Sequence, residues 1–147
     1  MRSATVALIV ICCSGACLAQ LNQPLCPKHI ETPFYPAIAH TAHVSGIVTL
    51  RLTIDAEGNV KDARASSRIN PPGAARLLEL SAITNVRHWT FVKPPSAPYE
   101  ETIVYDYQID DSGHHGITVS FDLPDHVTIW AEPSLVEPDQ TKPAKNN

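Results

Sequence analysis

The stretch ITNVRHWTF, residues 83–91, decides the fold, because it begins with the apolar spacing of a helix and ends with that of a strand. Plotted at roughly 100° per residue, segment 74–88 carries an apolar stripe along one side of a helix. Trp89 lies on the core side of the last turn, and Phe91 follows at strand spacing. We therefore expect Trp89 to close the end of a helix–sheet layer and Phe91 to begin the adjoining strand. The stripe consists of Ala75, Leu78, Ala82, Val86 and Trp89.

A β-hairpin is expected before this helix. Between residues 47 and 54 every second residue is apolar, which is typical of a strand with one buried face. Residues 55–59 form a turn in which Gly58 can adopt a positive φ, and residues 60–66 return antiparallel. The apolar side of the hairpin gives the helix a flat surface to pack on.

Further strands are expected after the helix. Residues 102–109 and 117–123 both alternate apolar and polar side chains, and residues 127–130 add a shorter pattern of the same kind. The sequence therefore predicts an α+β fold. It is a small two-layer sandwich, in which one α-helix packs on an antiparallel sheet of three strands plus one or two C-terminal strands.

The two ends of the chain differ from this domain in composition. Residues 1–19 combine Arg2, an apolar run and small residues, which predicts a secretory signal peptide cleaved before Gln20. A retained anchor is an alternative, although a helix over these residues measures only about 24 Å against the ~30 Å hydrocarbon core. Lipidation of Cys17 is another. After cleavage the chain keeps only Cys26, so no internal disulfide is expected. Residues 20–32 are interpreted as an extended lead-in and residues 132–147 as a disordered tail.

Charge and motifs exclude several classes of function. The net charge is −4 and the eleven lysines and arginines are scattered, so we expect no binding of nucleic acid or of an anionic membrane surface. No catalytic signature or phosphate loop occurs, and we expect neither an enzyme nor a cofactor. The pairs His40/His43 and His114/His115 lack carboxylate or thiolate ligands at a suitable interval, so no metal site is expected.

Two motifs, in this order, resemble a known family. Residues 35–60 begin YPAIA and continue through GIV to IDAEGNV, and residues 86–91 read VRHWTF. Together they resemble the TonB C-terminal domain, whose helix ends in a Trp-X-Phe motif, and the resemblance covers residues 33–109. The expected structural core is Tyr35, Pro36, Gly46, Val48, Leu50, Leu52, Ile54, Leu78, Ala82, Val86, Trp89 and Phe91.

The resemblance implies a protein-binding role in the periplasm or cell envelope. In that family the domain grips a short peptide of an outer-membrane transporter by strand addition, in energy-coupled transport. Transferred to this chain, the free edge is segment 102–109. The backbone contacts then come from Ile103, Val104, Tyr105, Asp106 and Tyr107.

Several departures from the family keep a second hypothesis open. No histidine precedes His29, where family transducers carry one in a membrane helix, and the lead-in at ~3.1 Å per residue reaches only ~40 Å. Residues 68–72 are interpreted as an inserted loop. The additional β segment, residues 110–131, is also placed where it could cover the docking edge. The alternative is therefore an exported structural or dimerisation domain, with its edge capped by its own chain and no transport role.

Overall fold

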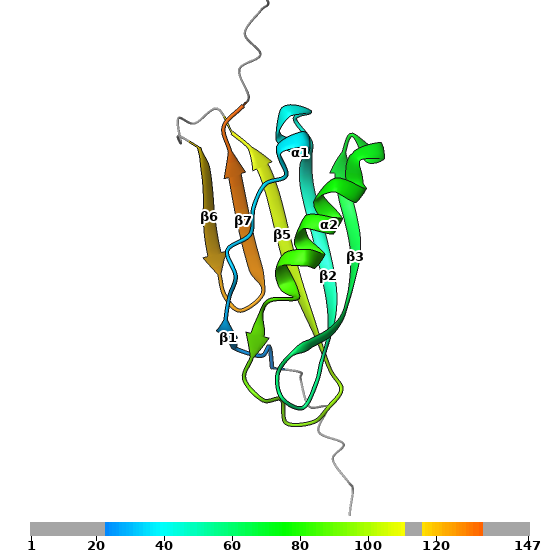
Figure 1. Ribbon diagram of the computed structural model, residues 1–147, viewed down its shortest axis with the longest axis vertical. Coiled ribbons are helices and arrows are strands. Elements are labelled where there is room, and N and C mark those ends of the chain that lie inside the picture. Colours follow the sequence, from blue (N-terminus) through cyan, green and yellow to red (C-terminus); the bar gives the residue numbers. More distant parts are fainter. Residues whose placement is uncertain (1–22, 111–115, 134–147) are drawn as a thin grey trace, which may run out of the picture.

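Two sheets and one main helix form the domain, and the computed structural model describes residues 23–110 and 116–133 (Figure 1). A five-stranded sheet has the order β3-β2-β5-β7-β6, and a two-stranded sheet joins β1 to β4. This confirms the predicted α+β sandwich. The elements are β1 (Pro27–His29), α1 (Ala37–Thr41), β2 (Ser45–Ile54), β3 (Val60–Asn70), a 3₁₀ turn (Pro72–Ala74), α2 (Ala75–Val86), β4 (Thr90–Phe91), β5 (Tyr99–Ile109), β6 (Ile117–Asp122) and β7 (His126–Ala131).

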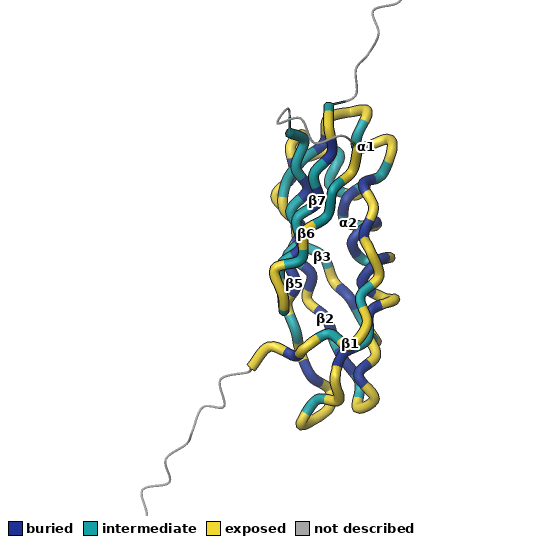
Figure 2. The backbone as a smooth tube through the Cα atoms, turned by 90° about the vertical axis from the view of Figure 1, so that its left-hand side faces the viewer, coloured by how far each residue is buried: buried dark blue, intermediate teal, exposed yellow. Residues whose placement is uncertain are grey.

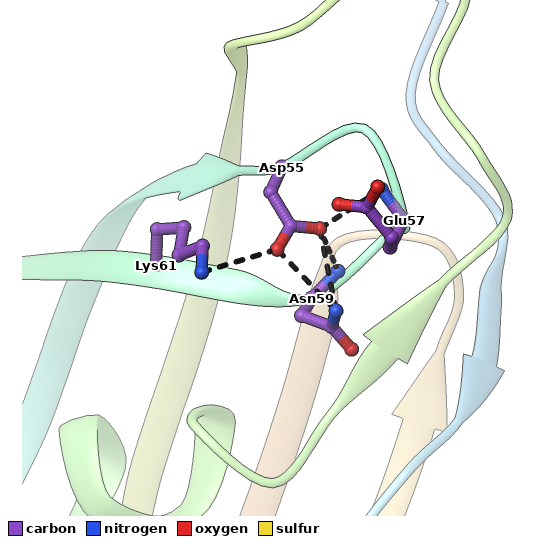
Figure 3. Close-up of polar contacts among 4 residues, drawn as sticks. All are labelled: Asp55, Glu57, Asn59 and Lys61. Carbon is purple, nitrogen blue, oxygen red and sulfur yellow. Dashed lines mark hydrogen bonds and ion pairs between the residues drawn. The ribbon is translucent and has the colours of Figure 1, made fainter.

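The β2–β3 hairpin is fixed by its turn. Asp55 Oδ1 accepts hydrogen bonds from the backbone N–H groups of Glu57 at 3.0 Å and Asn59 at 2.8 Å (Figure 3). The bond from Asn59 is the largest cause that lowers the pKa of Asp55, and Lys61 Nζ lies 3.5 Å from Oδ2. Gly58 has φ +93°, and a Cβ there would lie 2.2 Å from the Phe91 carbonyl oxygen. Only glycine therefore fits where the turn meets β4.

The hairpin is longer than the sequence pattern indicated. β3 continues to Asn70, which pairs with Ser45, so the prediction of a loop at residues 68–72 is wrong for residues 68–70. The apolar Ile69 is 8% exposed and faces the core, which gives the strand a physical reason to continue. The loop is confined to the prolines that follow.

Helix α2 packs on the hairpin as predicted, through contacts with β2 and β3. The Trp89 side chain is 1% exposed and Phe91 is 2% exposed, with ring centroids 6.4 Å apart. Both aromatic residues are therefore buried, as expected from their spacing. Phe91, however, is the last residue of β4, which pairs with β1 and not with the main sheet.

The predicted core residues are buried, except for Pro36 and Gly46, which are half-buried. Gly46 has φ +139°, and a Cβ there would lie 2.2 Å from the Arg68 carbonyl oxygen. Its role is therefore close approach of two strands, not apolar packing.

Residues 23–36, called the N-terminal strap below, dock on the domain. Leu25 is 6% exposed and its N–H donates to Glu101 Oε2 at 2.7 Å. The Tyr99 hydroxyl donates to the Gln23 carbonyl at 2.6 Å, and Val92 N–H donates to the Cys26 carbonyl at 3.0 Å. The lead-in is thus extended but attached to the domain, because Leu25 anchors it in the core. A single apolar residue makes no periodic pattern, so the sequence did not predict this anchor.

Within the described ranges, no helix has the length and apolar character that crossing a membrane requires. The predicted signal peptide, its two alternatives and most of the predicted tail lie outside those ranges.

Candidate functional site

Strand β5, which the sequence predicts as the docking edge, lies in the middle of the sheet. It pairs antiparallel with β2 and, along residues 104–109, parallel with β7. The Val104 N–H donates to the Asp125 carbonyl at 2.7 Å at one end of that ladder. The Asp110 N–H donates to the Ala131 carbonyl at 3.0 Å at the other. The prediction of a free β5 edge is therefore wrong. The backbone of five residues was expected to be free at this edge. Val104, Tyr105, Asp106 and Tyr107 pair with both β2 and β7, and Ile103 pairs with β2.

Strand β7 is part of the core and not a loosely held cover. Val127 and Ile129 are 0% exposed, and Ala131 is 1% exposed. Burying side chains of the first two kinds stabilises a protein by about 1.5–3 kcal/mol each. If a partner peptide displaced β7, the protein would lose the free energy of burying these side chains and the hydrogen bonds between β7 and β5. The peptide would restore only the hydrogen bonds with β5. Displacement of β7 is therefore unfavourable. Alternation in the sequence shows which side chains face inward, but not which strands are neighbours, so it could not reveal this arrangement.

Among the described residues, no strand pairs with the first half of β5 on its β7 side, and the N-terminal strap contacts this half through Glu101 and Tyr99. The Glu101 carboxylate accepts the Thr102 N–H at 3.1 Å through Oε1 and the Leu25 N–H at 2.7 Å through Oε2. The carboxylate thereby satisfies a backbone donor of β5 and holds the strap beside it. This half-edge is already occupied by side-chain and strap contacts.

Two strands of the described sheet keep one side without a neighbour, β3 and β6. The first carries four charged residues, Lys61, Asp62, Arg64 and Arg68. Charged side chains on an edge strand disfavour the addition of another strand. From Ile117 to Phe121, β6 has no charged residue, and its β-branched and aromatic side chains favour extended structure. Of the two, β6 is the edge better suited to strand addition.

The register shows which amides of β6 point outward. Glu132 N–H donates to the Gly116 carbonyl at 3.4 Å, which makes this a hydrogen-bonded pair at the end of the β6–β7 ladder. Hydrogen-bonded and non-hydrogen-bonded pairs alternate in an antiparallel ladder. The even-numbered residues therefore face β7. Within the part of the chain that the structure describes, the N–H and C=O groups of Ile117, Val119 and Phe121 point away from β7 and have no strand beside them.

The side chains of the same three residues form an apolar row on the core side of the sheet. Ile117 is 50% exposed, whereas Val119 and Phe121 pack partly against the core. The Phe121 ring centroid lies 6.3 Å from that of Trp89. Figure 2, which views the molecule from its β6 side, shows this strand in the colours of partial burial and exposure. An added strand would thus find both unpaired amides and an incompletely covered apolar row.

A buried polar cluster that the sequence pattern did not predict holds the N-terminal strap in place. Asn85 Oδ1 accepts hydrogen bonds from Tyr105 Oη at 2.7 Å and Trp89 Nε1 at 3.1 Å. Asn85 Nδ2 donates to the Glu31 carbonyl at 3.0 Å, and Trp89 Nε1 lies 3.2 Å from the same oxygen. Burial raises the pKa of Tyr105 well above its usual value. The available signal in the sequence was the position of Asn85 at the margin of the predicted apolar stripe, one helical turn before Trp89. An amide buried at such a position needs hydrogen-bond partners.

Two further hydroxyl groups, those of Ser81 and Tyr107, lie between α2 and the sheet. Ser81 Oγ donates to the Phe34 carbonyl at 3.0 Å, again holding the strap. Among the described residues the buried Tyr107 hydroxyl has no hydrogen-bond partner at bonding geometry. Burial raises the pKa of Tyr107 to about 12, and the nearby Ser81 hydroxyl opposes that rise. We assign this hydroxyl a packing role, since its ring packs edge-on against Tyr35 at 5.3 Å.

The remaining polar residues do not assemble a metal site in residues 23–110 and 116–133. No group of three histidine, cysteine or acidic side chains is close enough there to hold a metal ion. His40 Nε2 is hydrogen-bonded to the Glu132 carbonyl, and Cys26 is an exposed free thiol. His114 and His115 lie outside the described residues.

Comparison with known proteins agrees with this picture of a protein-binding domain. The model of the family described as Gram-negative bacterial TonB protein C-terminal matches residues 31–113, more than half of the chain. The match confirms the resemblance seen in the sequence, and it ends before β6 and β7. No curated protein matches the chain.

Proposed function

Because the chain belongs to the family of TonB C-terminal domains, we propose that it docks an extended segment of an outer-membrane transporter in energy-coupled transport. The family consists of non-catalytic protein-interaction domains, and it implies a location in the periplasm or cell envelope. In this proposal the transporter segment adds to the outer edge of β6. The resemblance implied docking at the edge of β5, but β7 already pairs with that edge.

The observation that carries the proposal is the uncharged outer edge of β6, with the free amides of Ile117, Val119 and Phe121. Strand addition derives its affinity from backbone hydrogen bonds and its specificity from alternate side chains. The apolar row on the core side favours a segment with alternating apolar residues. Recognition of this kind needs no catalytic residues.

Site-specific photocrosslinking tests where the transporter docks. A photoreactive amino acid replaces Ser120 on β6 or, as the matched control, Ser66 on β3; both are exposed serines on edge strands. In cells we expect the Ser120 position to capture an outer-membrane transporter and the Ser66 position to capture none. Capture from Ser66 alone, or of no transporter from either position, would contradict the proposal.

A backbone variant tests the mechanism in the same cells. Val119→Pro removes an outward N–H without removing a donor to β7, whereas Val119→Ala keeps the N–H and removes only side-chain bulk. We expect the proline variant to lower capture about fivefold, the equivalent of about one hydrogen bond. The alanine variant should retain capture. Equal loss in both variants would point to the side chain in place of the backbone edge.

Export is proposed through the N-terminal segment. An intact mass that corresponds to a chain beginning at Gln20 would support cleavage of a signal peptide. A retained segment or a lipid on Cys17 would give a larger mass, and the intact mass of the protein purified from cells separates these outcomes.

A further inference from the structure

We infer that two copies of this chain pair through their β6 strands, around a twofold axis at Val119, to form a continuous sheet across a homodimer. The inference concerns a second copy of the chain, so it stands apart from transporter docking. Both uses require the same outward amides, and a docked segment and the second copy therefore exclude one another.

The register of this pairing follows from the direction of the free amides. The backbone N–H and C=O groups of Ile117, Val119 and Phe121 point outward. An antiparallel partner must therefore place residues whose own N–H and C=O groups point outward opposite them. Three twofold registers satisfy that condition near the centre of the strand. The one centred on Val119 pairs residues 117–121 of one copy with residues 121–117 of the other, and it makes about six backbone hydrogen bonds, two per hydrogen-bonded pair.

The side chains in this register are complementary. Ile117 of one copy lies opposite Phe121 of the other on the core side, and apolar–aromatic cross-strand pairs stabilise sheets. Ile117 is 50% exposed in the single chain, so the partner would cover the open end of the apolar row. On the other side of the sheet, Thr118 lies opposite Ser120 of the second copy, a pair of hydroxyl groups.

Charge also permits this register. Asp122 is the charged residue of β6, and like charges directly opposite one another destabilise a sheet. With the axis at Val119, Asp122 lies opposite Gly116 of the second copy and not opposite Asp122. An isologous contact of this kind closes after two copies, because each β6 edge is used once. The charged edge of β3 then forms both ends of the joined sheet.

Engineered disulfides test the register directly. In the full chain with its four native cysteines replaced by serine, Thr118→Cys and Ser120→Cys are introduced together or singly. The two positions face each other across the axis as a non-hydrogen-bonded pair, about 4.5 Å apart at Cα. Mild oxidation should link the double variant into a dimer. Each single variant should stay unlinked, because two diagonal cysteines lie beyond the ~7 Å limit for a disulfide.

Mass measurement in solution tests the pairing itself. We expect the full chain to convert from monomer to dimer as its concentration rises, and Val119→Ala to do the same. Val119→Pro should remain monomeric, while Ala65→Pro, at the outer edge of β3, should still dimerise. Circular dichroism checks that the proline variants fold; if Val119→Pro does not fold, the disulfide result decides.

In the mass measurement, a wild-type chain that stays monomeric at every concentration, or a dimer that a folded Val119→Pro variant still forms, would overturn the inference. In the oxidation experiment, disulfide-linked dimers of the single variants, or no linked dimer of the double variant, would also overturn it. Transporter capture is measured separately, so either idea can fail while the other survives.

Discussion

Replacing Trp89 by alanine should remove a large part of the stability of this domain. The side chain is 1% exposed and its ring packs against Phe91, Tyr105 and Phe121, with centroids 6.2–6.4 Å apart. Emptying a buried aromatic site costs about 3–5 kcal/mol. Domains are usually stable by about 5–15 kcal/mol, so the variant should be much less stable or unfolded at room temperature.

Trp89→Phe separates packing from hydrogen bonding. It keeps a ring but loses the Nε1 donor to Asn85 and Glu31. Each acceptor retains another donor, from Tyr105 and from Asn85 respectively, so no acceptor is left unsatisfied. We expect a cost of about 1–2 kcal/mol, from the lost donor and the smaller ring. Urea unfolding followed by circular dichroism measures both variants. An alanine variant within about 1 kcal/mol of wild type would refute the assigned role of Trp89.

Three further results are expected. Truncation after Ile109 removes β6 and β7, so size-exclusion chromatography should show aggregation from the exposed β5 edge, and a stable monomer would contradict the core role of β7. The pKa of Asp55 is lowered in the folded state, so its contribution to stability is present above its unfolded value and is lost as the pH falls through the folded one; Asp55→Asn should flatten the acid limb of a stability–pH curve below about pH 5. Three buried tyrosines have raised pKa values, one to about 12, so the stability they contribute is present below their unfolded pKa of ~10 and is lost as the pH rises beyond it. Tyrosinate absorbance should therefore appear together with unfolding, and its appearance in a still-folded protein would contradict the burial of Tyr35, Tyr105 and Tyr107.

The sequence predicted the hairpin, the helix and most of the core because those features follow from local periodicity. Alternation in β2 places Val48 and Leu52 inward whatever its neighbours are. The helical stripe likewise brings Leu78 and Val86 against the hairpin. Such patterns depend on which side of an element is apolar, and the sequence displays that directly.

The order of strands was not predictable in the same way. An inward-facing row on β5 looks the same whether one neighbour or two are present, so its edge appeared free. The hydrogen-bonded cluster around Asn85 was not predicted because a polar residue at the margin of an apolar stripe usually faces solvent, and its partner in the strap, Glu31, lies far away in the sequence. Both gaps come from contacts between residues far apart in the chain.

Residue-resolved hydrogen exchange of the dilute monomer tests the central claim, that β5 is covered and β6 is the open edge. The amide of Val104 donates to Asp125, just before β7, and the amide of Asp110 donates to Ala131 at the end of β7. Both amides should exchange slowly, through global unfolding. The amides of Val119 and Phe121 should exchange orders of magnitude faster. Fast exchange at Val104 with protection at Val119 would show that β5 is the open edge after all.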